Sequence, residues 1–414
     1  MTQRALCSIG FAVVAGALLL AQNQRRPAEP ALLMDGHVHI TTRTYFEGID
    51  PWTPQPVGPF DYARARAGGA NVVIENLGPY GYEDYNAIVK QVGRLLETFH
   101  RTVEAHRDKM ELALSGADVR RIVRSGKMAV LLGIEGGWDQ DGDIDILRLW
   151  YRLGVRTIVF SSHQTNAFTD SATAGGEHWG GINARGRQLI EEMNRLGLLV
   201  DVTHATPAAQ RQIIAVSRAP VVASHTAIQL SDGGAGMPQD ILKALVAKGG
   251  MVGLTGGAQL SPAYAQWVKD QQGLGNIDGL SLQEVIRPKV PLVRQRAPDF
   301  DYWDAFDNEM RTRWRRYWSK PFVLPSSAPL PTVDVFADYV AKVVAIAGAD
   351  HVGIGLDLFQ SRAYFSDFSD ASGYSRMAAA LRRHHVPDSV LGPNWLRVLD
   401  AARVDVPASR LSER

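Results

Sequence analysis

Two histidines stand one residue apart in the stretch Asp35-Gly36-His37-Val38-His39, near the start of the chain. Side chains alternate along an extended strand, so His37 and His39 would point to the same side. Two neighbouring imidazoles can hold one ion of zinc or a similar transition metal. A polar strand end with two unrelated histidines would look the same, so the pair indicates a metal site only together with other ligand-type residues of the chain.

Further ionisable side chains stand at the ends of other apolar runs. They are Glu135, His163, His204, His225 and Asp357. Each of them taken singly fits a polar strand end, but their recurrence indicates a metal site. Glu135 is the strongest case, because a carboxylate that ends the apolar run 128–132 is costly to bury unless it is paired or bound to a metal. The glycines after it allow a sharp turn beside a ligand.

The elements that would position these residues are short β-branched runs alternating with amphipathic helical patterns, as in parallel βα units. The candidate strands are 33–37, 71–76, 129–135, 156–163, 198–204, 220–225, 250–255 and 351–357, and candidate helices include 85–107, 185–196, 207–216 and 333–347. Gly154 and Gly197 are expected to end helices in the left-handed conformation. Eight such units predict an α/β fold of the (β/α)8 TIM-barrel type, whose C-terminal strand ends meet at one mouth.

An open, doubly wound sheet is the alternative fold, but no glycine-rich dinucleotide-binding turn follows the first strand. The composition is compatible with one large domain or two ordinary ones, since the chain has 414 residues and is 45% hydrophobic. Its formal net charge of +1 gives no reason to expect nucleic acid or an anionic membrane surface as a partner.

The N-terminus has the pattern of an export signal. A basic Arg4 precedes an apolar run over residues 5–21, and a polar stretch over 22–30 follows as a linker. We therefore expect a signal peptide over 1–21 and a periplasmic or secreted protein, with an uncleaved membrane anchor as the alternative. The single cysteine, Cys7, lies in this leader, so the mature chain would have no disulfides.

Several motifs resemble those of the membrane (renal) dipeptidase family, the zinc peptidases of peptidase family M19, within the wider metallo-dependent amidohydrolase barrels. The resemblance covers most of the chain from Asp35 to about Ala402. The matching segments are Gly-Ile-Glu-Gly-Gly at 133–137, Leu-Gly-Val-Arg at 153–156, Ser-His-Gln-Thr-Asn at 162–166, the stretch 186–204 ending in Asp-Val-Thr-His, Ala-Ser-His-Thr at 223–226, His-Val-Gly-Ile-Gly at 351–355 with Asp357, and Gly-Pro-Asn-Trp-Leu-Arg at 392–397. The stretch 186–204 is the most specific of them.

The resemblance implies an exported dipeptidase with two zinc ions per chain. His37 and the residue at 39 would bind one ion, His204 and His225 the second, and Glu135 would bridge both. A water activated between the ions would attack the scissile amide.

His163 and Asp357 would contact the substrate and perform the remaining chemistry. His163 would stabilise the developing oxyanion, and Asp357 would handle the proton that goes to the leaving amine. The implied partner is a small-molecule substrate such as a dipeptide. The family often forms dimers, so a homodimer is an expectation that rests on the resemblance alone.

The sequence departs from the family pattern at three places. His39 stands where the family usually has Asp, which removes one negative charge from the site. The stretch 231–238 lacks the arginine that grips the terminal carboxylate of the substrate in the family. The second Asp of the family's Asp-Phe-Asp-Gly is lost, because Asp357 is followed by Leu358, Phe359 and Gln360.

A long segment over about 256–331 interrupts the predicted barrel domain, 31–405, after its seventh strand. It is rich in aromatic residues and arginines: Trp267, Tyr302, Trp303, Trp314, Tyr317, Trp318, Arg294, Arg296, Arg311, Arg313, Arg315 and Arg316. An excursion at this point emerges at the barrel mouth. A lid or specificity element and an oligomer-forming insertion are both consistent with this content.

Two alternatives to a dipeptidase remain open from the sequence. One is a related amidase, lactonase or deaminase of the amidohydrolase type. The other is a non-catalytic periplasmic binding protein that retains the barrel. The presence of Glu135, His163 and Asp357 together favours an enzyme, because a pure binding protein needs no group to shuttle protons.

Overall fold

The computed structural model describes residues 31–56, 58–78, 85–136, 138–139, 141–162, 164–172, 177–231, 236–256, 260, 263, 308, 311–312, 329–358 and 365–403. The predicted signal peptide and linker, His163 and most of the predicted insertion lie outside these residues. Within the described part of the chain, no helix has both the length and the apolar character needed to cross a membrane.

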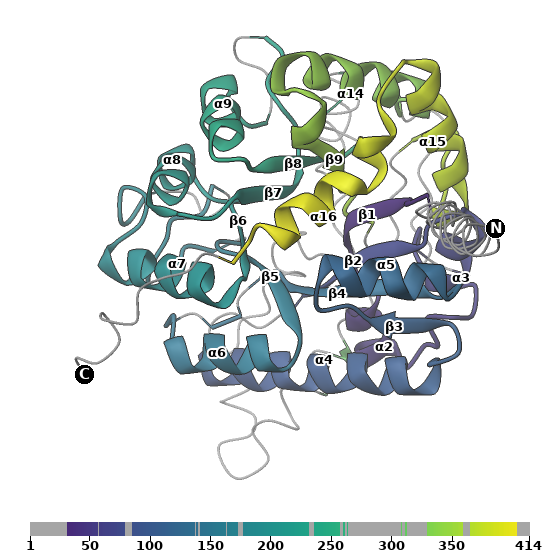
Figure 1. Cartoon of the computed structure of the whole chain (residues 1–414). Helices are drawn as coiled ribbons and strands as arrows, with labels where there is room; N and C mark the ends of the chain where they lie inside the picture. Colours follow the sequence, from purple (N-terminus) through teal and green to yellow (C-terminus); the bar gives the residue numbers. More distant parts are fainter. Residues whose placement is uncertain are drawn as a thin grey trace, which may run out of the picture. The chain divides into compact units, whose positions relative to one another are not determined.

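Eight parallel strands pair in chain order to form the wall of a barrel (Figure 1). They are β1 (Met34–Val38), β2 (Val72–Leu77), β4 (Met128–Ile134), β5 (Val155–Val159), β6 (Leu199–Asp201), β7 (Val221–Thr226), β8 (Met251–Leu254) and β9 (Val352–Ile354). The ring closes just beyond β9, where Leu358 bridges Val38 and the Asp357 N–H donates to the His37 carbonyl at 3.0 Å. The predicted TIM barrel is therefore confirmed, with all eight predicted strands present.

One further strand, β3 (Met110–Leu112), pairs with the first residues of β4, Met128–Val130, and was not predicted. Its three residues are too few to show a two-residue period. The additional pairing lengthens the sheet beside β4 without entering the ring.

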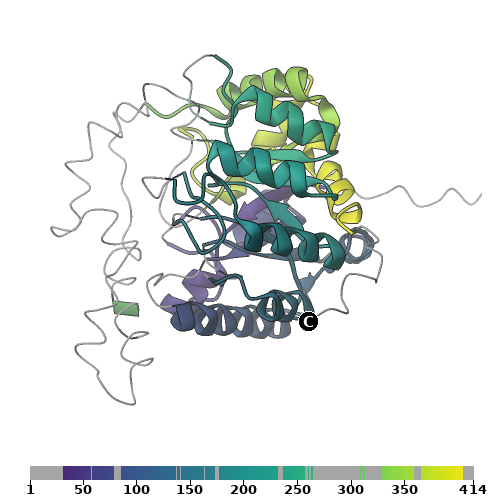
Figure 2. The ribbon, with the colours of Figure 1, turned by 90° about the vertical axis from the view of Figure 1, so that its left-hand side faces the viewer.

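The helices lie outside the strands, which Figure 2 shows in the turned view. They are α2 (Thr41–Glu47), α3 (Tyr62–Ala67), α4 (Tyr85–Ala105), α5 (Gly116–Arg124), α6 (Ile144–Arg152), α7 (Ala184–Leu196), α8 (Pro207–Val216), α9 (Gln239–Ala247), α14 (Val333–Ala347), α15 (Tyr374–Arg383) and α16 (Pro393–Asp400), with 3-10 turns at Ala349–His351, Ala371–Gly373 and Asp388–Leu391. The predicted helices α8 and α14 have the expected bounds. Gly197 and Gly154 have φ angles of 84° and 103° where α7 and α6 end, as predicted.

Trp395 from α16 fills the interior of the ring. Its indole N–H donates to the Ile354 carbonyl of β9 at 3.1 Å. Three strand glycines leave room for the ring, because a Cβ at Gly36, Gly253 or Gly353 would lie within 2.9 Å of it. Trp395 of helix α16 thus fills the centre of the barrel. The C-terminal ends of the strands remain for a metal or catalytic site.

Candidate metal and catalytic centre

The structure gathers six of the seven residues singled out in the sequence at the C-terminal ends of the barrel strands. They are His37 in β1, His39 just after it, Glu135 directly after β4, His204 after β6, His225 in β7 and Asp357 after β9. The seventh, His163, lies outside the described residues.

Glu135 stands between two pairs of histidines. Its Oε2 lies 2.9 Å from His37 Nε2 and 3.0 Å from His39 Nε2. Its Oε1 lies 2.7 Å from His204 Nε2 and 3.4 Å from His225 Nε2. Within each pair the two Nε2 atoms are 3.1 Å apart. One carboxylate therefore presents one oxygen to each histidine pair.

Irregular backbone aims these side chains. Between Asp35 and Val38, β1 has one residue more than the facing part of β2, which makes a β-bulge in the segment that carries His37. His204 and Asp357 have φ angles of 66° and 55°, in the left-handed region that few non-glycine residues adopt. Such backbone strain clusters at functional sites, where the rest of the fold maintains it. Gly136, with φ of 103°, makes the sharp turn predicted after Glu135.

Asp357 completes the group at the mouth. Its Oδ1 lies 3.5 Å from His39 Nε2, and its side chain is 30% exposed. Donor atoms of Asp357, His37, Glu135 and His225 all lie within 4.8 Å of one another. Asp357 thus combines access to solvent with contact to the buried histidines.

The buried histidines and carboxylates of the site shift one another's pKa values in opposite directions. Burial opposes protonation of His39, but the carboxylates of Asp357 and Glu135 outweigh it and raise its pKa to about 10. The same balance, with Glu135 as the main carboxylate, raises the pKa of His225 to about 9. Burial and the neighbouring His225 lower the pKa of His37 to about 4. The two carboxylates therefore favour positive charge at this cluster, either on an imidazole or on a bound cation.

The donor set fits zinc. Imidazole nitrogens and carboxylate oxygens are ligands of choice for this ion. Glu135 is only 8% exposed, and its pKa is held well below the usual range because the surrounding imidazoles, His225 first, outweigh the effect of burial. His39 Nδ1 donates to the Asn76 carbonyl at 2.7 Å, which leaves Nε2 to face the carboxylate.

Two supporting carboxylates were not identified from the sequence. Asp35, in β1, accepts from the Leu356 N–H at 3.0 Å and the Tyr374 hydroxyl at 2.6 Å, and burial raises its pKa to about 6. Glu75, in β2, accepts from the Ile40 and Thr41 N–H groups at 2.9 and 2.7 Å. Both hold the segment that carries His37 and His39.

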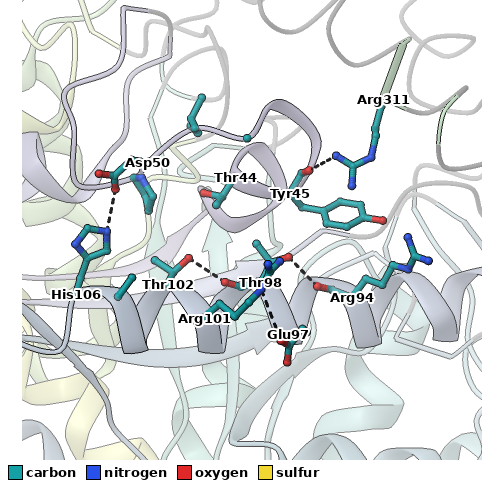
Figure 3. A pocket seen from close by; sticks show the side chains of 14 residues that line it. Thr44, Tyr45, Asp50, Arg94, Glu97, Thr98, Arg101, Thr102, His106 and Arg311 are labelled. Carbon is teal, nitrogen blue, oxygen red and sulfur yellow. Dashed lines mark hydrogen bonds and ion pairs between the residues drawn. The ribbon is translucent and has the colours of Figure 1, made fainter.

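The predicted insertion is described at only a few positions, one of which is Arg311. Its Nη1 donates to the Tyr45 carbonyl at 2.6 Å, and the guanidinium lies 4.4 Å from the Tyr45 ring centre (Figure 3). These residues border a cavity of about 670 Å³ between α2 and α4, which is separate from the histidine site. Arg294 and Arg296 lie outside the described residues.

The sequence comparison identifies the family to which this site belongs. Residues 22–410 match the membrane dipeptidase family, peptidase family M19. The chain belongs to this family. It is therefore an enzyme of a metallopeptidase family, and the family implies zinc and a small peptide substrate. The predicted resemblance is confirmed, and the idea of a non-catalytic binding protein loses its support.

Curated relatives and solved structures agree with the family. Dipeptidase verJ of Clonostachys rogersoniana is 25% identical over 89% of this chain and 84% of its own length. Human dipeptidase 3 is 32% identical over a shorter region, 39% of this chain and 33% of its own length. The probable dipeptidase PvdM from Pseudomonas aeruginosa has the same fold, with a TM-score of 0.71 and 22% identity over 91% of this chain and 96% of its own.

A metallopeptidase from Rhodobacter sphaeroides, liganded with a phosphinate mimic of the dipeptide L-Ala-D-Ala, has a TM-score of 0.67 at 17% identity. The match covers 90% of this chain and 99% of that structure. Identity at this level establishes the shared fold alone.

Zinc affinity of this family member should rise with pH. Below pH 9, His39 and His225 are both protonated in the metal-free chain, since their pKa values are about 10 and 9. A ligand imidazole must be neutral, so binding releases these protons. Calorimetry at pH 7 in buffers of different ionisation enthalpy should find about two protons released by these imidazoles per loaded chain, in addition to any proton lost by metal-bound water. The apparent affinity should gain about tenfold per pH unit for each proton released. Proton release near zero would contradict the raised pKa values.

Proposed function

We propose that this M19 enzyme is an exported dipeptidase that hydrolyses the amide bond of a small peptide with two zinc ions per chain. His37 and His39 would hold one ion, His204 and His225 the other, and Glu135 would bridge them. The observation that carries the proposal is the division of the Glu135 carboxylate, with one oxygen to each histidine pair.

The chemistry of the bound ions is general to two-metal hydrolases. Zinc polarises the scissile carbonyl and lowers the pKa of water, so that a nucleophile is available at neutral pH. The protein then has to move one proton from the attacking water to the leaving amine. Asp357 is suited to this step, because its carboxylate contacts His39 and is partly exposed at the mouth. His163 is proposed as the donor that stabilises the oxyanion, on the family resemblance of its motif.

The residue that would bind the substrate's terminal carboxylate differs from the one used in the family. The stretch 231–238 has no arginine, and Asp232 within it would repel an incoming carboxylate. A bidentate guanidinium is the usual partner of such a group. We propose that an arginine of the insertion, Arg294 or Arg296, takes this role.

Metal analysis combined with a substrate panel tests the function. Dialysed protein should contain close to two zinc ions per chain and should hydrolyse at least one dipeptide. That dipeptide should be compared with its own C-terminal amide and with an N-acyl-amino acid. A large preference for the free acid, abolished by replacing Arg294 or Arg296 with Ala, is the expected result.

Each departure from this result identifies a different error. One tight ion per chain would overturn the binuclear site but leave a mononuclear peptidase. Equal or better hydrolysis of the C-terminal amide would show that the free carboxylate is not recognised. Cleavage of the N-acyl-amino acid, an ester or an amine-bearing ring in place of any dipeptide would point to the related amidase, lactonase or deaminase.

Export is proposed from the N-terminal sequence. The basic Arg4 and the apolar run 5–21 support a cleaved signal peptide and a periplasmic or secreted location. N-terminal sequencing of the mature protein is expected to begin after Ala21. A mature chain that retains residues 1–21 would support the membrane-anchored alternative.

A further inference from the structure

Ser224, on β7, touches one histidine of each pair. Its Oγ lies 2.8 Å from Nδ1 of His37 and 3.0 Å from Nδ1 of His225. The two imidazole rings themselves are close, with centroids 3.8 Å apart. Ser224 is 1% exposed, so this hydroxyl has little access to solvent and makes its contacts inside the barrel.

A β-bulge in β7 and two closely packed glycines determine the position of the Ser224 hydroxyl. Adjacent residues of a regular strand point to opposite faces, but β7 has an extra residue between Ala223 and Thr226 relative to β8. This bulge lets Ser224 and His225 both reach the site. The Ser224 carbonyl packs against Gly253 and Gly355, where a Cβ would lie only 2.0 and 1.8 Å from its oxygen.

Asp201, in the neighbouring strand β6, holds the backbone of Ser224 by a hydrogen bond. The Ser224 N–H donates to Asp201 Oδ1 at 3.1 Å. Thr203 donates two hydrogen bonds to the same Asp201 oxygen, from its N–H at 2.9 Å and from its hydroxyl at 2.7 Å. The serine is thus held between β6 and β8, which gives its side chain a defined position.

We propose that Ser224 is a positioning residue that couples the two metal sites. It rests on the proposed binuclear function. An imidazole that gives Nε2 to a cation carries its hydrogen on Nδ1, and a serine hydroxyl has two acceptor lone pairs. Ser224 can therefore accept from His37 and His225 at once. Both rings are fixed in the tautomer that presents Nε2 to Glu135, and one side chain sets the affinity of both pairs.

The coupling predicts that one substitution weakens both ions. Ser224→Ala should lower the affinity for each zinc ion about 10- to 100-fold in a competition titration with a chromophoric chelator. Ser224→Thr, which keeps the hydroxyl, should recover most of the loss. Ser161→Ala is the matched control, because Ser161 is equally buried after β5 on the same rim but donates to the Asp170 carbonyl at 3.3 Å. It should leave both affinities unchanged.

Nuclear magnetic resonance of the zinc-loaded protein gives a readout independent of activity, and its wild-type part does not depend on whether the variant folds. The Nδ1–H protons assigned to His37 and His225 should be protected from exchange in the wild type and should both lose protection in Ser224→Ala, whereas that of His39, which donates to the Asn76 carbonyl, should stay protected. If the wild type holds two ions and Ser224→Ala weakens one or neither, or if the two protons are not protected, the coupling role is overturned and the binuclear site stands. If the wild type holds one ion, the binuclear site and the coupling fall together.

Discussion

Glu135→Gln should abolish zinc binding and peptide hydrolysis together. The substitution keeps the shape of the side chain but removes its charge and turns one of its two oxygens into an amide NH₂. In the wild type, each carboxylate oxygen of Glu135 faces one histidine pair. The amide of the variant must therefore turn its NH₂ group toward one of the two pairs. We expect fewer than one tightly held ion per dialysed chain and hydrolysis on the order of 10³-fold or more below wild type.

The matched control is Glu192→Gln on α7. Glu192 is also buried, at 5% exposed, but its oxygens bind Arg148 at 2.7 Å and Arg195 at 2.6 Å, away from the histidines. This variant should lose stability and keep two zinc ions. The folded metal-free state of Glu135→Gln should also show lower pKa values for His39 and His225, because both lose the carboxylate that raises them. Full metal content in Glu135→Gln would remove the bridging role.

The strand-end rule accounts for what the sequence could predict about this site. The C-terminal ends of parallel barrel strands share one rim, so His204 and His225 were expected to converge although 21 residues separate them. Local alternation likewise predicted that His37 and His39 act together. The spacing alone did not reveal the bulge in β1, because a β-bulge of this kind has no sequence signature of its own.

The supporting carboxylates depend on contacts that the sequence does not display. Glu75 lies inside an apolar strand, the same signal that identified Glu135, and the cost of burying a carboxylate applies equally to both. Its partners are the N–H groups that begin α2, which only the packing of β1 beside β2 brings close. Asp35 meets Tyr374, 339 residues away, and no periodicity in the chain encodes that contact.

Asp357→Asn should separate proton transfer from metal binding. Turnover of the best dipeptide should fall on the order of 10²-fold or more, because an amide cannot accept the proton of the attacking water. Zinc content should stay at two ions per chain, since the four histidines and Glu135 remain. Steady-state kinetics and metal analysis of the same preparation give both numbers, and Asp350→Asn, an exposed aspartate of the same region, should leave both unchanged.

The backbone makes asparagine the right choice for this test. Asp357 has φ of 55°, and asparagine tolerates the left-handed region better than most residues, so the substitution adds little strain. The Asp357 N–H closes the barrel by donating to the His37 carbonyl, a bond that the side-chain change leaves in place. A fall in rate therefore reports on the carboxylate and not on the closure of the ring.

The opposite outcome for metal would assign Asp357 a different role. Its donor oxygen lies within 4.8 Å of those of His37, Glu135 and His225, close enough for it to serve as a ligand. Loss of one ion in Asp357→Asn would make it part of the metal shell, which would compensate for the negative charge missing at His39. Retention of both ions with near-normal turnover would exclude both roles. Only retained metal with slow turnover supports the proton shuttle, because that combination requires a group that acts on the reaction and does not hold the ions.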